Sequence, residues 1–163
     1  SRTSAVWIAA AAGCSSRDAA CTGVSGTKAA QDGLEASFTC CRRDAEGIHM
    51  QMTLRNTTDR DVTLGKEAVS PIAIDLGSKR VDAKVFIQRY VYDCDGPGYE
   101  ELTNVPGALR INCHASETVK VLVPVTVAEQ ASPWHVRVAG AWSTGTPVVL
   151  DVPAAALKPA TGP

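Results

Sequence analysis

The chain has 163 residues, of which 45% are hydrophobic and 20% are charged. These fractions are typical of a globular protein of about one domain, long enough to bury a sizeable core. The formal net charge is −1, with 16 basic and 17 acidic residues. This balance argues against nucleic acid as a partner, because duplex binders carry a basic excess.

The N-terminal segment, residues 1–13, is a short apolar run that ends in small residues before Cys14 and two serines. The sequence AAGC resembles the signal of a bacterial lipoprotein, in which a lipid is attached to the cysteine after cleavage before it. The resemblance covers the first sixteen residues and implies a lipid anchor at Cys14, although the usual leucine three positions upstream is Ala11. The alternative is that residues 4–12 are retained as an interaction strand. The run is far below the ~20 residues that a membrane-spanning helix needs.

Six cysteines without zinc-ligand spacing predict disulfide bonds, and therefore an oxidising compartment. They are Cys14, Cys21, Cys40, Cys41, Cys94 and Cys113. Cys94 and Cys113 flank one long loop, which predicts a bond between them. Cys40 and Cys41 are adjacent, so on a strand they point to opposite faces and each needs another partner, with the two N-terminal cysteines nearest in sequence. If Cys14 is lipidated, five cysteines remain and one is unpaired; if it is not, all six can pair.

Three further segments follow. Residues 14–33 are rich in Ser, Ala, Gly and Thr and predict a linker, and residues 154–163 predict a tail rich in Pro and Ala. Between them, residues 34–153 carry the periodic part of the chain, in which apolar residues recur at every second position. This is the period of a β-strand with one buried face.

The periodic segments, in chain order, begin with GIHMQMTLRN and the turn NTTDRD, followed by PIAIDL and then by AKVFIQRYVYD, which is apolar on both faces. In ETVKVLVPVTVAE every second residue is valine, and Pro124 predicts an edge strand because it cannot donate to a ladder. The strand WHVRVAGAW, with Trp134 and Trp142 in the core, and a last strand at 148–152 follow. The residues expected inside are Ile48, Met50, Met52, Leu54, Val119, Val121, Val123, Val125, Val127, Val136 and Val138.

About eight short strands and no helical stripe predict an all-β fold, an antiparallel sandwich of two sheets. The strand ending in LRNTTDRDV, the long loop, the valine-rich strand after ASETVK and the closing WHVRV strand resemble bacterial immunoglobulin-like domains over residues 34–153. That resemblance rests on pattern and implies the architecture, an immunoglobulin-like sandwich.

Two clusters invite a metal hypothesis. Asp93, Asp95, Glu100 and Glu101 crowd one glycine-containing loop, where oxygen ligands could hold calcium, although the spacing is not that of an EF-hand and a solvated acidic loop is the simpler interpretation. His49, Met50 and Met52 are copper-type ligands, but alternation places His49 on the polar face and both methionines on the apolar one. We therefore expect a surface histidine and two core methionines.

The triplet Asn56-Thr57-Thr58 matches a glycosylation acceptor in a turn that we expect to be exposed, which matters only in a eukaryotic source. There is no GxSxG motif, and the three histidines lie in unremarkable contexts. We expect no catalytic residue, no cofactor and no bound transition metal.

The expected function is a non-enzymatic binding or scaffold module of a bacterial cell envelope, periplasmic or at the cell surface, with a protein partner and an optional membrane tether through Cys14. One alternative is a structural subunit of a pilus, secretion-system collar or virion, in which residues 4–12 join a neighbour's sheet and the valine edge at 119–127 accepts such a strand. Another is an accessory domain of a secreted enzyme.

Overall fold

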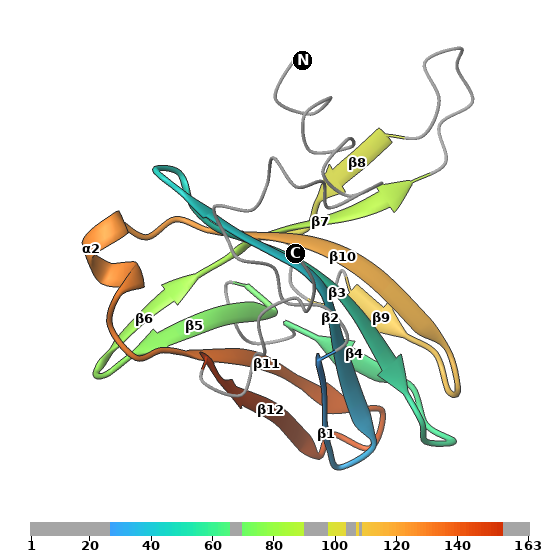
Figure 1. The fold of residues 1–163 in the computed structure, drawn as a ribbon. Coiled ribbons are helices and arrows are strands. Elements are labelled where there is room, and N and C mark those ends of the chain that lie inside the picture. Colours follow the sequence, from blue (N-terminus) through green and yellow to red (C-terminus); the bar gives the residue numbers. More distant parts are fainter. Residues whose placement is uncertain (1–26, 66–69, 90–97, 104–106, 108, 155–163) are drawn as a thin grey trace.

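A computed structural model describes residues 27–65, 70–89, 98–103, 107 and 109–154 of this chain (Figure 1). These residues form two six-stranded sheets, with a single four-residue helix in the described part of the chain. All strand pairs are antiparallel, and the two sheets face each other across one apolar core. The predicted fold class, an all-β antiparallel sandwich of two sheets, is confirmed.

Sheet 1 has the strand order β1–β2–β3–β10–β7–β8. Its strands are β1 (Thr27–Gln31), β2 (Leu34–Asp44), β3 (Gly47–Asn56), β10 (Ser116–Val123), β7 (Lys84–Arg89) and β8 (Gly98–Glu101).

Sheet 2 is built around β11, which pairs with β12 along one edge and with β5 and β4 in succession along the other. Beyond these, β6 pairs with β5 and β9 pairs with β4. Its strands are β11 (His135–Trp142), β12 (Pro147–Pro153), β5 (Ile72–Leu76), β4 (Val62–Leu64), β6 (Lys79–Asp82) and β9 (Leu109–Ile111).

The structure has twelve strands where the sequence predicted about eight. Of the strands that the sequence did not single out, five have three to five residues each, namely β1, β4, β6, β8 and β9. The sixth, β2, has eleven. A strand of three residues shows barely one period of alternation, so it gives no sequence signal. The first described strand, β1, begins at Thr27, within the segment interpreted as a linker, and its register with β2 makes it part of sheet 1.

The core contains the predicted apolar residues with one exception. Ile48, Met50, Met52, Leu54, Val119, Val121, Val123, Val125, Val136 and Val138 are all at most 3% exposed, and Trp134 and Trp142 are buried with them. Val127 is 65% exposed, so its predicted burial is wrong. Strand β10 ends at Val123 and the helix α2 (Val127–Gln130) follows, with Thr126 as its N-cap accepting a hydrogen bond from the Glu129 N–H. Because the backbone is helical after the Thr126 cap, side chains no longer alternate between two faces, and Val127 is left exposed.

The valine-rich strand is central rather than at an edge, which corrects the second prediction for this segment. β10 lies between β3 and β7 and is paired with both. Pro124 follows the last paired residue, Val123, so its missing N–H removes no bond from the ladder. A paired strand cannot accept a neighbour's strand, and the assembly hypothesis therefore loses the acceptor on which it relied.

No helix among the described residues has the length and apolar character needed to cross a lipid bilayer.

Candidate functional site

Four turns meet at one end of the sandwich, and we call them the turn end (Figure 1). They are the β1–β2 turn at Asp32–Gly33, the β3–β4 turn at 57–61, the β9–β10 turn at Asn112–Ala115 and the β11–β12 turn at 143–146. The β3–β4 turn is the one to which the other three are fastened.

Backbone hydrogen bonds make these attachments. Thr57 N–H donates to the Gly33 carbonyl at 2.9 Å, and Ser143 N–H donates to the Asp61 carbonyl at 2.8 Å. From the β9–β10 turn, His114 N–H donates to the Thr58 carbonyl at 3.2 Å. Because each bond joins main chain to main chain, the turns hold a fixed relative position that does not depend on flexible side chains.

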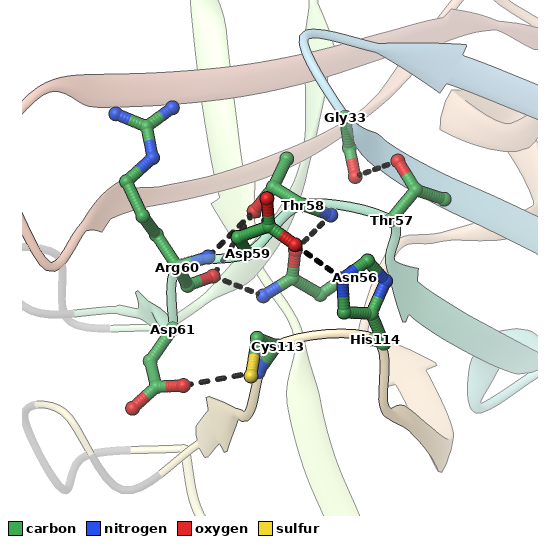
Figure 2. A network of polar contacts seen from close by, with 9 residues as sticks. All are labelled: Gly33, Asn56, Thr57, Thr58, Asp59, Arg60, Asp61, Cys113 and His114. Atoms are coloured by element: carbon green, nitrogen blue, oxygen red, sulfur yellow. Dashed lines mark hydrogen bonds and ion pairs between the residues drawn. The ribbon is translucent and has the colours of Figure 1, made fainter.

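Asn56 organises the β3–β4 turn from inside (Figure 2). Its side chain is fully buried, and its amide nitrogen donates to the carbonyls of Arg60 at 2.6 Å and Ile111 at 3.2 Å. Its amide oxygen accepts from the N–H and the hydroxyl of Thr58, at 2.9 and 2.7 Å. The turn predicted over NTTDRD is therefore present, but its first residue is enclosed, and in the folded chain the glycosylation acceptor is not exposed.

Ion pairs line the rim of the turn end. His114 Nε2 lies 2.6 Å from Asp59 Oδ1, and both side chains are exposed, at 58% and 96%. His114 adopts a backbone φ of +57°, a left-handed conformation uncommon for residues other than glycine. Arg110 binds Asp61, whose other carboxylate oxygen accepts from the Cys113 N–H at 3.0 Å. The Arg110 hydrogen bond, followed by that from Cys113, holds the pKa of Asp61 below its ordinary value.

Arg60 connects this rim to the core. Its guanidinium lies 5.6 Å from the ring centroid of Trp142, within cation–π range, while the Trp142 side chain itself is buried. The rim thus offers carboxylates, guanidinium groups and an imidazole on a rigid support. Within the described ranges no group of three His, Cys, Asp or Glu side chains could hold a metal ion.

The structure bears on the cysteine predictions in part. Cys113 is exposed and carries a free thiol, so the structure does not contain the predicted bond to Cys94, which itself lies outside the described residues. Cys40 and Cys41 lie on β2 as expected, just after a shift in its register with β3, and are paired with Gln51 and Met50. Cys14 and Cys21 lie outside the described residues, so lipidation at Cys14 and the remaining pairings stay predictions.

The structure describes some of the residues that were considered as metal ligands. Asp93 and Asp95 lie outside the described residues, and Glu100 is on the edge strand β8, exposed. Met50 and Met52 are in the core, as predicted.

His49 points to the other face of β3, as alternation predicted, but it is only 4% exposed, so the expectation of a surface histidine is wrong. Its Nε2 lies 2.9 Å from Asp44 Oδ1 across the β2–β3 hairpin, a partner that alternation alone does not reveal.

At the opposite end, an open hollow of about 740 Å³ lies between the β5–β6 hairpin, α2 and the adjoining parts of β11 and β12. Its carboxylates already have partners: Lys79 pairs with Glu129 at 3.6 Å, the His135 imidazole lies 3.2 Å from Asp151, and Asp75 binds Arg80. The lining contains no Phe, Tyr or Trp side chain. The turn end, where three turns are hydrogen-bonded to the β3–β4 turn, is therefore the stronger candidate.

No protein-family model and no curated protein matches this chain. Among solved structures, the chain is similar to an uncharacterized β-sandwich protein from Clostridium difficile 630, with 11% sequence identity, a TM-score of 0.38, and coverage of 76% of this chain and 88% of that chain.

Proposed function

We propose that this chain is a non-enzymatic binding or scaffold module of a bacterial cell envelope and that it contacts a protein partner through the turn end. The observation that carries the proposal is the fastening of three turns to the β3–β4 turn by main-chain hydrogen bonds. Binding residues on loops need a rigid support to avoid a large ordering cost, and these turns have it.

The chemistry of the rim favours a protein over a membrane or an apolar ligand. Asp59, Arg60, Arg110 and His114 are all exposed and bring both signs of charge to one surface. Mixed charge of this kind sets register and selectivity at protein–protein contacts, whereas a lipid surface calls for basic or apolar side chains.

The extracytoplasmic location rests on the sequence. Six cysteines and the AAGC motif before the first Ser-rich stretch both favour an exported chain. In the anchored form, Cys14 would carry the lipid and residues 14–26 would connect the membrane to β1.

A cross-linking experiment in intact cells tests the binding surface. A photo-reactive amino acid replaces Asn112, which is exposed at the turn end, or Ser78, which is exposed in the β5–β6 turn at the opposite end. We expect one discrete adduct from position 112 and none from position 78. The adduct should fall several-fold when Arg60→Glu and Arg110→Glu reverse two charges on the rim. Equal adducts from both positions, or an adduct indifferent to the charge reversal, would contradict the assignment.

Intact mass and fractionation test the location. A chain that begins at Cys14 with added lipid mass in the membrane fraction supports the anchored form, and a chain in the envelope fraction that keeps residues 1–13 supports the retained strand. A chain found only in the cytoplasm would contradict both forms of the proposal.

A further inference from the structure

The charged side chains on the rim of the turn end differ in whether they already have a partner. Asp59 lies 2.6 Å from the His114 imidazole, and Asp61 is paired with Arg110. Among the described residues, no carboxylate is paired with the guanidinium of Arg60, although this side chain is exposed. A protein that contacts the rim therefore meets two carboxylates with internal partners and one arginine without a counter-charge.

The strand register places Arg60 beside an aromatic ring. Strand β4 begins at Val62, whose partner on β11 is Trp142. The Asp61 carbonyl accepts a hydrogen bond from the Ser143 N–H at 2.8 Å, so the two chains stay adjacent past the end of the ladder. Arg60 stands two residues before Val62, and its guanidinium lies over the Trp142 ring, 5.6 Å from the centroid. The contact follows from the way β4 joins β11.

The ring that supports Arg60 is itself held in place. Trp142 is buried, and its backbone N–H donates to the Thr146 carbonyl at 2.9 Å. The β1–β2 turn approaches the same ring, because a Cβ added at Gly33 would lie 3.7 Å from Cζ2 of Trp142. A ring in a closely packed interior keeps its position. The ring therefore restricts the guanidinium of Arg60, which is attracted to its face.

A restricted guanidinium is well suited to bind a carboxylate. Arginine carries five N–H donors in one plane, an arrangement that matches the two oxygens of a carboxylate. Figure 2 shows the Arg60 guanidinium extending away from the Asn56 network, and no hydrogen bond from it is found within the described part of the chain. Ordering a long side chain on association costs free energy. For Arg60 the ring contact has already met part of that cost.

The charges near Arg60 favour a single carboxylate over a ligand with several negative charges. Asp59 and Asp61 flank Arg60 in the sequence, and Asp32 is exposed on the β1–β2 turn that approaches Trp142. Nucleic acids, phosphorylated peptides and anionic lipid surfaces would all be repelled by these carboxylates. One aspartate or glutamate side chain can reach the arginine with less repulsion.

We propose that Arg60 is the main anchor of the turn end and binds an aspartate or glutamate carboxylate of the protein partner. The inference rests on the proposed function, because it names the partner's chemistry at that same surface. Arginine is one of the residues that most often carry the binding free energy of protein interfaces. Arg110 and His114 are weaker anchors, since each would have to leave an internal partner to take a new one.

Photo-cross-linking in intact cells measures the contribution of Arg60. A benzophenone amino acid replaces Asn112 in the full chain, which carries in addition Arg60→Lys or Arg60→Gln. Lysine keeps the charge but lacks the planar set of donors, so we expect the amount of adduct to fall about threefold. Glutamine removes the charge as well, and we expect the amount of adduct to fall about tenfold.

The matched control is Arg43→Gln, made with the same cross-linker at position 112. Arg43 is also exposed, and within the described residues it too lacks an ion pair. It differs from Arg60 in having no aromatic ring beneath it there, and it lies beside the β2–β3 turn at the opposite end of the sandwich. Its replacement should leave the amount of adduct unchanged.

Peptide mass spectrometry of the adduct then identifies the partner and the segment joined to position 112. We expect an aspartate or glutamate in or beside that segment. Replacing this residue by arginine should restore the adduct of an Arg60→Glu chain to within about twofold of the parent level, because both charges of the pair are then reversed. A phosphorylated residue at this place would assign Arg60 to phosphate and overturn the proposal.

The outcomes separate this inference from the proposed function. A discrete adduct that is indifferent to both Arg60 substitutions, or that falls equally with Arg43→Gln, would overturn the role of Arg60 and leave the turn end as the binding surface. Failure of every charge swap to restore the adduct would do the same. No adduct from position 112 would overturn both. Each variant is checked for an unchanged β-type circular dichroism spectrum, and Arg60→Lys decides if Arg60→Gln does not fold.

Discussion

Asn56 is the residue on which the turn end depends most. A buried side-chain amide has two donors and an acceptor to satisfy, and Asn56 satisfies them with the carbonyls of Arg60 and Ile111 and with two groups of Thr58. It joins β3 to the end of β9 while shaping the turn between β3 and β4. Turn propensity predicted that NTTDRD bends, but propensity is local and does not reveal that the first residue is enclosed by a strand 55 residues away.

Replacing Asn56 should therefore cost more than replacing its neighbour. Asn56→Ala removes the buried hydrogen bond to the Ile111 carbonyl and one of two donors to the Arg60 carbonyl, which keeps the Thr58 hydroxyl, and we expect a loss of about 2–4 kcal/mol in the free energy of unfolding. Thr57→Ala removes one exposed hydrogen bond to Gly33, which should cost about 0.5–1 kcal/mol. Urea unfolding of both variants measures the difference. Equal losses would show that the Asn56 network is not what holds the turn.

Asp61 gives the turn end a defined pH dependence. Its pKa in the folded chain lies below the ordinary value of 3.8, first because of Arg110 and then because of the Cys113 N–H. A lowered folded pKa contributes stability that is present above the unfolded pKa and is lost as the pH falls toward the folded pKa. Asp61→Asn should lower the melting temperature at pH 7, and the difference from the parent should shrink as the pH falls below about 3.8.

The control for that experiment is Glu46→Gln, an exposed carboxylate in the β2–β3 turn. It should show no comparable convergence with the parent. A melting-temperature difference for Asp61→Asn that stays constant between pH 7 and pH 3 would show that the carboxylate charge is not what stabilises the rim.

At the scale of elements, alternation predicted which residues face inward but not where strands end or which strands are neighbours. The inward faces of β3, β10 and β11 are as expected, because each of these strands has at least eight residues. The end of β10 and the start of α2 were missed, since the valine alternation continues through Pro124 into a helix of four residues. Strand order is set by packing between distant segments, so a proline at one position could not establish an edge.

Two valines from the same alternating run, one in β10 and one in α2, test where the strand ends. Val121 is fully buried in β10, and Val121→Ala should cost about 2–3 kcal/mol because it leaves a cavity. Val127 is 65% exposed at the start of α2, and Val127→Ala should change stability by no more than ~0.5 kcal/mol, since alanine also favours helix. The urea unfolding midpoints of the two variants are compared, provided that the dependence of the unfolding free energy on urea is the same in both. Similar costs would mean that the valine strand continues to residue 127.

At the scale of the molecule, the sandwich could be predicted, whereas the candidate site could not. Two covered sheets follow from alternation over several strands, since each apolar face must be buried against another. The turn end brings Asp59 to His114 and Asp61 to Arg110, pairs separated by about fifty positions in the chain. Neither pair forms a motif.

Strand order also determines which backbone N–H groups are protected together, and hydrogen exchange rates measure that protection. β3, β10 and β11 have partners on both sides, so most of their N–H groups exchange only when the sandwich opens, whereas β6 and β9 each pair on one side among the described strands. We expect peptides from β10 to exchange on the order of 100-fold more slowly than those from β6. If β10 exchanges as fast as β6, the valine-rich strand is an edge after all, and the arrangement of sheet 1 is wrong.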